Sequence, residues 1–181
     1  MKNEKNKQQV LLNLVMTALF AALIMVMTAY LFHIPTGIND GYLHFGDALI
    51  YLAACFLPTP YAALAAAIGG GMADLVSGVP IWIVPTMLIK ALISLPYSCK
   101  SEKIVTGRHI LMTILSGVIS IGGYFLAERL LFGSWAAAAL SLPASLIQSS
   151  GSAVIFLIIG FAMDRVQLKN RLQTLYRVKG V

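Results

Sequence analysis

Polar and aromatic side chains recur at helical spacing inside otherwise apolar stretches of this sequence. Trp82, Thr86 and Lys90 are four residues apart, which places an indole, a hydroxyl and an ammonium on one stripe of a helix. Tyr124 and Glu128 repeat this spacing on a later stretch. A lysine inside a membrane helix costs about 2.5 to 3.5 kcal/mol on insertion scales, so it needs a partner, a cavity or a ligand. These residue types predict reversible binding of a small, flat, polar ligand.

A second group of polar residues complements these two stripes. Gln148 lies on the last apolar stretch, and the segment GYLHFGD, residues 41–47, joins a histidine to two aromatic rings. Gly41 and Gly46 are expected to give this segment unusual backbone angles, so that it folds over the ligand as a lid. The predicted substrate-binding residues are Asn39, Tyr42, His44, Trp82, Thr86, Lys90, Tyr124, Glu128 and Gln148.

Each of these residues also has a purely structural interpretation. Lys90 could form an ion pair with Asp74 or Glu128 inside the membrane. Serine, threonine and glutamine often hydrogen-bond neighbouring membrane helices, at about 0.6 kcal/mol each. Tyr42 and Phe45 could simply anchor their loop among lipid headgroups. Binding is favoured because the polar groups of three stretches gather toward the same predicted end.

The sequence lacks the motifs of the common catalytic and cofactor sites. It has no GxxxxGK[ST] phosphate loop, no HExxH, no GxSxG and no cysteine and histidine cluster with zinc spacing. His33 and His44 flank the loop, but two histidines alone make a weak metal site. We therefore predict no enzyme activity, no cofactor, no metal and no use of ATP by the chain itself.

The surrounding sequence is typical of a membrane protein. Of its 181 residues, 59% are hydrophobic and 11% are charged, with a mean hydropathy of +0.83, whereas soluble domains carry about 25% charged residues. At about 20 residues per crossing, the chain has room for a single membrane domain, residues 1–181, with six spans. The predicted spans are residues 9–33, 46–57, 60–77, 81–97, 109–132 and 142–163. The second span is short, so a re-entrant pair that leaves four full spans is the alternative.

Basic residues determine the predicted orientation of this bundle. They cluster before the first span, between the fourth and fifth spans and after the sixth, whereas the loops of the opposite side carry none. Because cytoplasmic loops collect lysine and arginine, both termini are predicted in the cytoplasm and residues 41–47 at the outer face. The net charge of +6 is then a topology signal and no sign of nucleic-acid binding. The predicted fold class is an all-α integral membrane protein, a multi-pass bundle of six transmembrane helices.

The first span carries small residues at helical spacing. Ala18 and Ala22 form a small-xxx-small pair, which lets another helix approach closely in lipid. The third span repeats this device with Ala62 and Ala66. The partner of the first pair can therefore be another protein or a helix of the same bundle.

Together these features resemble the substrate-binding S components of energy-coupling factor (ECF) transporters. The likeness extends over essentially the whole chain and includes the alanine pair, the HFGD motif at residues 44–47, the segment GGGMADLVSG and the basic C-terminal tail. The resemblance implies a subunit of the bacterial plasma membrane that captures a vitamin or its precursor from outside. It also implies a coupling transmembrane protein and two ATPase subunits as partners, with Ala18 and Ala22 as the docking face.

The candidate residues suit a small flat heteroaromatic ligand with hydroxyl or amino groups. Among S components, the chain most resembles those for hydroxymethylpyrimidine or pyridoxine. Thiamine would favour carboxylates, riboflavin would need a larger cavity, and the anion pantothenate stays open because of Lys90. Two other functions also stay open: a self-sufficient secondary carrier, which would usually show paired inverted halves, and a ligand-free membrane assembly protein.

Overall fold

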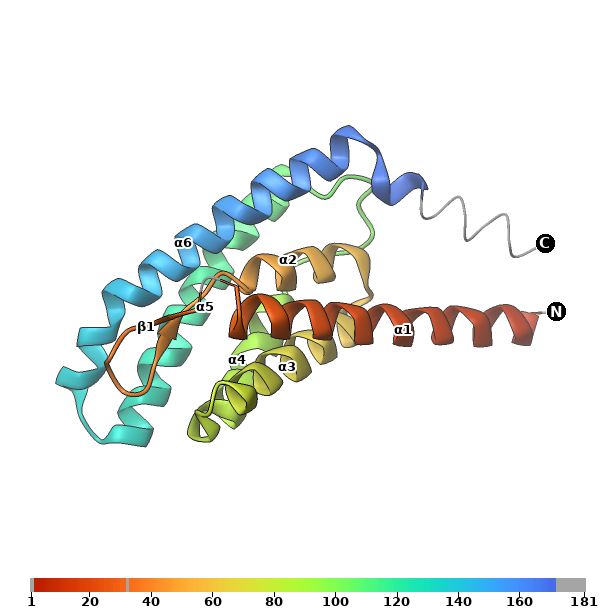
Figure 1. Ribbon diagram of the computed structural model, residues 1–181. Helices are drawn as coiled ribbons and strands as arrows, with labels where there is room; N and C mark the ends of the chain where they lie inside the picture. Colours follow the sequence, from red (N-terminus) through yellow and green to blue (C-terminus); the bar gives the residue numbers. More distant parts are fainter. Residues whose placement is uncertain (1, 32, 172–181) are drawn as a thin grey trace.

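The computed structural model describes residues 2–31 and 33–171, and within them the chain forms six α-helices. They are α1 (Lys2–Ala29), α2 (Asp47–Phe56), α3 (Thr59–Val76), α4 (Ile83–Ser94), α5 (Gly107–Phe132) and α6 (Trp135–Arg165). A short 3-10 helix, η1 (Pro80–Trp82), leads into α4. Two short strands, β1 (Ile34–Pro35) and β2 (Tyr42–Leu43), pair antiparallel between α1 and α2 and form a hairpin, residues 34–43. The hairpin lies at one end of the bundle, the hairpin end, whereas α1 starts and α6 finishes toward the other end, the termini end (Figure 1).

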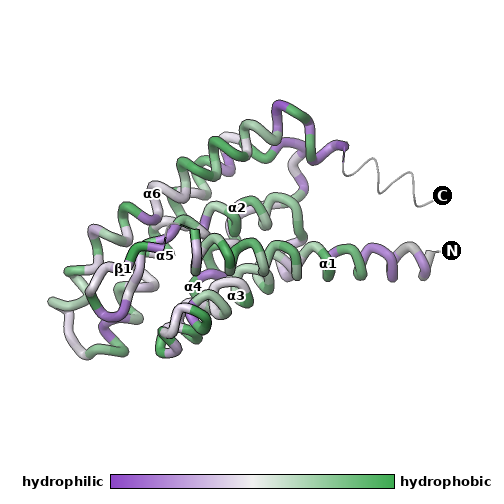
Figure 2. Tube along the Cα trace, in the orientation of Figure 1, coloured by the Kyte–Doolittle hydropathy of each residue, from purple (hydrophilic) through white to green (hydrophobic). Residues whose placement is uncertain are grey.

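The helices have the composition of membrane segments. By length and composition, three stretches of the described chain can cross a membrane, namely residues 6–29, 107–132 and 135–165. Figure 2 shows apolar colour along the helices and polar colour at the start of α1 and the end of α6. The prediction of a helical membrane protein is confirmed at this level. The number of crossings and the side of the membrane that holds the termini stay predictions.

The last helix is longer than the span predicted for it. It begins at Trp135, because the Ser134 side chain caps it by accepting a hydrogen bond of 3.2 Å from the Ala137 amide. Residues 136–139 are all alanine, the strongest helix former, so the segment expected as a loop is helical. Pro143 lies inside the helix, as proline often does in membrane helices.

Three consecutive glycines of α3 bring its neighbours close. A Cβ at Gly69 would lie 2.7 Å from the Ala21 carbonyl oxygen of α1, so only glycine permits this approach. A Cβ at Gly70 would lie 2.8 Å from Cγ of Lys90, and a Cβ at Gly71 would lie 2.6 Å from Cγ of Met87. In lipid, such close contact is a main source of helix association. The glycine run therefore fixes α3 between α1 and α4.

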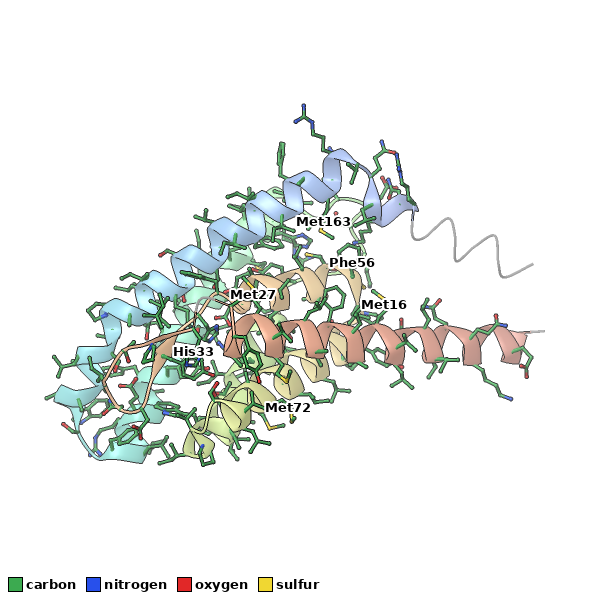
Figure 3. All side chains as sticks on the ribbon, in the orientation of Figure 1. Met16, Met27, His33, Phe56, Met72 and Met163 are labelled. Carbon is green, nitrogen blue, oxygen red and sulfur yellow. The ribbon has the colours of Figure 1, made fainter. Side chains whose placement is uncertain are left out.

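The second helix forms the centre of the bundle. Eight of its ten residues are buried, and it packs against α1, α3, α4 and α6. Tyr51 on this helix stacks on Tyr97, with 5.0 Å between the ring centroids. Asp47, the first residue of α2, is fully buried where the hairpin joins the helix. The start of α1, by contrast, extends beyond the other helices, and the side chains drawn there point to all sides (Figure 3).

Candidate functional site

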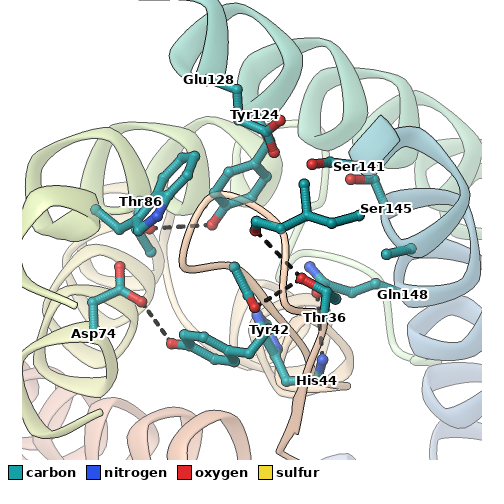
Figure 4. A pocket seen from close by; sticks show the side chains of 14 residues that line it. Thr36, Tyr42, His44, Asp74, Thr86, Tyr124, Glu128, Ser141, Ser145 and Gln148 are labelled. Atoms are coloured by element: carbon teal, nitrogen blue, oxygen red, sulfur yellow. Dashed lines mark hydrogen bonds between the residues drawn. The ribbon is translucent and has the colours of Figure 1, made fainter. Parts of the chain in front are cut away.

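A cavity of about 70 Å³ lies against the hairpin, among helices α3, α4, α5 and α6 (Figure 4). The hairpin contributes one wall of this cavity, and the helices contribute the other. Its lining residues are Thr36, Ile38, Gly41, Tyr42, His44, Asp74, Trp82, Thr86, Tyr124, Glu128, Ser141, Ala144, Ser145 and Gln148.

Aromatic rings and hydroxyl groups shape the helix side of the cavity. The rings of Trp82 and Tyr124 lie 5.8 Å apart and are tilted by 56°. The Tyr124 hydroxyl donates a hydrogen bond of 3.3 Å to Oγ1 of Thr86. Flat faces beside a few fixed polar atoms are what a small aromatic ligand requires.

Asn39 fastens the tip of the hairpin to two helical segments. Its carbonyl oxygen accepts a hydrogen bond of 3.0 Å from the Trp82 indole, and its Nδ2 donates one of 2.9 Å to Oε2 of Glu128. Asn39 and Asp40 have φ angles of 52° and 54°, in the left-handed region that asparagine and aspartate tolerate best after glycine. These contacts hold the hairpin over the cavity.

Gly41 and Gly46, which were expected to give residues 41–47 unusual backbone angles, do not have such angles. Gly46 has an ordinary helical φ of −59°, and neither it nor Gly41 is among the residues with positive φ. A Cβ at Gly46 would collide with the Thr28 side chain, so glycine is required here for space. The expectation of unusual angles at Gly41 and Gly46 was wrong, because the positive φ angles of the hairpin lie at Gly37, Asn39 and Asp40.

Lys90 forms an ion pair in the interior of the bundle. Its Nζ lies 2.6 Å from Oδ1 of Asp47, and the two side chains are 1% and 0% exposed. Nζ also lies 5.1 Å from the centroid of the Tyr124 ring. The structural alternative considered for Lys90, an ion pair with Asp74 or Glu128, named the wrong partner, because the carboxylate beside Nζ is that of Asp47. Lys90 does not itself line the cavity.

Comparison with known proteins connects this arrangement to a family. A model of the family described as "ECF-type riboflavin transporter, S component" matches residues 9–165 of the chain. The chain belongs to this family. A protein of Pyrococcus woesei, named only as an uncharacterized protein in gap 3'region, is 32% identical over 114 residues, which are 62% of this chain and 76% of the relative.

As an S component, the protein is the substrate-binding membrane subunit of an ECF-type transporter. S components work with an energy-coupling module, and their family is one of transporters and not of enzymes. The resemblance inferred from the sequence is thus confirmed at the level of the family. The hydroxymethylpyrimidine or pyridoxine type within it stays a prediction.

The structure brings most of the predicted binding residues of this S component to one place. Seven of the nine line the cavity: Tyr42, His44, Trp82, Thr86, Tyr124, Glu128 and Gln148. The other two lie just outside the lining, Asn39 in the hairpin tip and Lys90 in the buried ion pair. Contact of any of these nine residues with substrate is still a prediction.

The sequence interpretation missed several lining residues. Asp74 was considered only as a partner for Lys90, although an acid in an apolar stretch is as costly as a lysine and gives the same signal. Ser141 lies one turn before Ser145 on α6, and it belongs to this helix because the helix begins at Trp135, before the predicted span 142–163. Thr36 comes from the hairpin, where its Oγ1 donates a hydrogen bond of 2.8 Å to the Gly41 carbonyl oxygen.

The expected docking pair lies on the surface of the S component. Ala18 and Ala22 are exposed, whereas Phe20, Ala21 and Ile24 on the opposite face of α1 are buried. Because α1 packs on α3 and α2 through this opposite face, the alanine pair is not used for packing within the chain.

His44 is held in its neutral form in the cavity wall. Burial, and next the nearby Lys90 ammonium, lower the pKa of His44 to about 3. Its Nδ1 accepts a hydrogen bond of 3.1 Å from the Gly46 amide, which requires an unprotonated nitrogen. Its own amide donates to Oε1 of Gln148 at 3.4 Å.

We expect acid to destabilise the protein through His44. Its pKa is about 6.5 in the unfolded chain and lower in the folded one, so its contribution is complete above pH 6.5 and is lost as the pH falls toward 3. Between pH 6.5 and pH 5 the loss should be about 1 to 2 kcal/mol. The test is thermal unfolding of wild type and of His44→Asn, which keeps an acceptor near the Nδ1 position, across this pH range. The stability of wild type should fall more steeply with acid than that of the variant, which has no imidazole to protonate. Equal pH dependence of the two proteins would contradict the assignment.

Proposed function

We propose that this S component captures hydroxymethylpyrimidine or pyridoxine from outside the cell for ATP-driven uptake. The observation that carries the proposal is the small cavity, about 70 Å³, with aromatic walls and several hydrogen-bonding groups. An engineered cavity of about 150 Å³ holds benzene, so this one has to widen even for a single ring. The three-ring riboflavin named in the family's description would need a far larger opening of the same site.

The orientation that we propose places the hairpin outside and both termini in the cytoplasm, with six membrane crossings. It is supported by the basic residues, which collect in the segment between α4 and α5 and after α6. In this orientation the cavity faces the medium from which a vitamin is taken. Tyr42 and Asn39, both in the hairpin, would then gate access to it.

The partners in the proposal are a coupling transmembrane protein and two ATPase subunits. Ala18 and Ala22 are proposed as the surface that contacts the coupling protein. Support comes from their exposure and from their position on one stripe of α1 with Leu11, Val15 and Val26, all of them exposed. An apolar stripe with small residues at its centre is suited to a second membrane helix.

Direct titration tests the substrate. We expect the purified protein in detergent or nanodiscs to bind hydroxymethylpyrimidine or pyridoxine at least tenfold more tightly than riboflavin or pantothenate. Riboflavin is too large for the small cavity, and the two carboxylates of its lining, Asp74 and Glu128, oppose the pantothenate anion. Isothermal titration calorimetry with all four compounds gives the ranking. Preferential binding of riboflavin would show that the hairpin opens widely and would overturn the proposed substrate while leaving the S-component function intact.

A further inference from the structure

Asp74 on α3 is a buried acid whose surroundings point to a ligand. Its side chain is 3% exposed and lines the cavity. Its Oδ1 accepts a hydrogen bond of 2.6 Å from the Tyr42 hydroxyl, whereas its Oδ2 is buried with no hydrogen-bond partner among the described residues. A buried carboxylate oxygen without a donor is costly. Beside a cavity, this cost is relieved by a donor that comes from outside the chain.

Other acids near the cavity are already engaged. Asp47 also has an oxygen, Oδ2, without a hydrogen-bond partner among the described residues, but its Oδ1 is paired with Lys90 and it lies outside the lining. Glu128 accepts a hydrogen bond from the hairpin tip. None of the described residues that line the cavity is lysine or arginine, and His44 is neutral near pH 7. The site therefore offers negative charge and acceptor atoms, which suit a ligand with N–H donors or a positive charge and oppose an anion.

We propose that Asp74 selects the ligand, and that its carboxylate binds an aminopyrimidine through the amino group and the adjacent ring N–H. This inference rests on the proposed function and deepens it. A carboxylate presents two oxygens in one plane, and an amino group beside a protonated ring nitrogen presents two parallel N–H donors at matching separation. The proton on the ring nitrogen comes from solvent, so the bound pair is charge-assisted. Pyridoxine has no amino group beside its ring nitrogen, so of the two favoured vitamins Asp74 selects hydroxymethylpyrimidine.

Tyr42 contacts the same carboxylate that the ligand would use. Figure 4 shows its hydroxyl directed from the hairpin strand toward Asp74. Burial and the neighbouring Asp74 carboxylate raise the pKa of Tyr42, which keeps its proton and makes it the donor. A ligand that engages both oxygens displaces this hydroxyl from Oδ1. Because Tyr42 belongs to β2, ligand binding at Asp74 is thereby coupled to the position of the hairpin.

The test compares two pyrimidines on wild type and Asp74→Asn. The probes are hydroxymethylpyrimidine and its 4-oxo analogue, in which a carbonyl replaces the amino group. Wild type should prefer the amino compound at least tenfold. Asp74→Asn should bind the amino compound about 10- to 100-fold more weakly, as expected for lost hydrogen bonds to a charged group. Because the asparagine amide can donate to a carbonyl, this variant should lose or reverse the preference, which a purely structural role would not change.

Two further variants control the result. Asp40→Asn removes the same charge from an exposed position of the same hairpin and should leave both affinities unchanged. Tyr42→Phe keeps the ring and frees Oδ1, so the amino compound should bind more tightly than in wild type, because it no longer has to displace the Tyr42 hydroxyl. An unchanged preference in Asp74→Asn overturns the inference. If that variant fails to fold, equal wild-type affinity for the two pyrimidines overturns it. Wild-type binding of riboflavin alone, with neither pyrimidine, is the distinct result that removes the proposed substrate itself.

Discussion

Replacing Lys90 with methionine is expected to lower the free energy of unfolding by about 3 to 5 kcal/mol, the cost of leaving one member of a buried ion pair without its partner. The pair is almost completely buried, and its Nζ to Oδ1 distance is 2.6 Å. The second oxygen of Asp47, Oδ2, has no hydrogen-bond partner among the described residues, so the ammonium is the main compensation for this carboxylate. Unfolding of the purified variant, by heat or by SDS titration, measures the loss.

A second substitution separates the ion pair from simple loss of packing. In Lys90→Met/Asp47→Asn the uncompensated charge is gone, so at least half of the lost stability should return. Lys7→Met is the matched control, since Lys7 pairs with Glu4 where both side chains are about two-thirds exposed, at 67% and 69%. Such a surface pair contributes about 1 kcal/mol or less to the free energy of unfolding, so Lys7→Met should lose no more than this. A Lys90→Met protein that unfolds like wild type but binds ligand poorly would contradict this role and would show that Lys90 contacts the ligand.

The helical stripes were the part of the site that the sequence could predict. Trp82 and Thr86 reach the cavity as their spacing implies, and Tyr124 and Glu128 reach it from α5. Helical spacing depends only on local backbone geometry, so it holds for any tertiary arrangement of the helices. It cannot, however, say how deep a residue lies, and Lys90 on the first stripe is one turn too deep to line the cavity.

Contacts between distant segments could not be predicted in the same way. Asp47 and Lys90 are 43 positions apart, and they meet because α2 begins inside the bundle, directly after the hairpin. The hairpin itself has positive φ angles at Gly37, Asn39 and Asp40, whereas the expectation had placed the unusual angles at Gly41 and Gly46. The ion pair is a tertiary contact, so periodicity and composition carry no signal for it. The turn is local, and the adjacent Asn39 and Asp40 are a signal for it that the sequence interpretation did not use.

Docking through α1 gives the second large effect that we expect. Replacing Ala18 or Ala22 with tryptophan should abolish vitamin uptake by the assembled transporter, because a large side chain keeps a partner helix from approaching closely. Ligand affinity of the isolated protein should change less than twofold, since neither alanine lines the cavity. Uptake of labelled vitamin into proteoliposomes that contain the complete complex, beside calorimetry on the subunit alone, measures the two quantities separately.

The matched control is an exposed alanine on another face. Ala139 on α6 is exposed, as Ala18 is, so Ala139→Trp adds the same bulk away from the α1 stripe and should leave uptake near the wild-type rate.

The buried face of α1 gives the opposite comparison. Ala21 is 6% exposed and its carbonyl oxygen is in close contact with Gly69, so Ala21→Trp should lower stability and both functions together. If Ala18→Trp behaves like Ala21→Trp, with binding and uptake lost to the same extent, the stripe is part of the fold and the coupling protein contacts another surface.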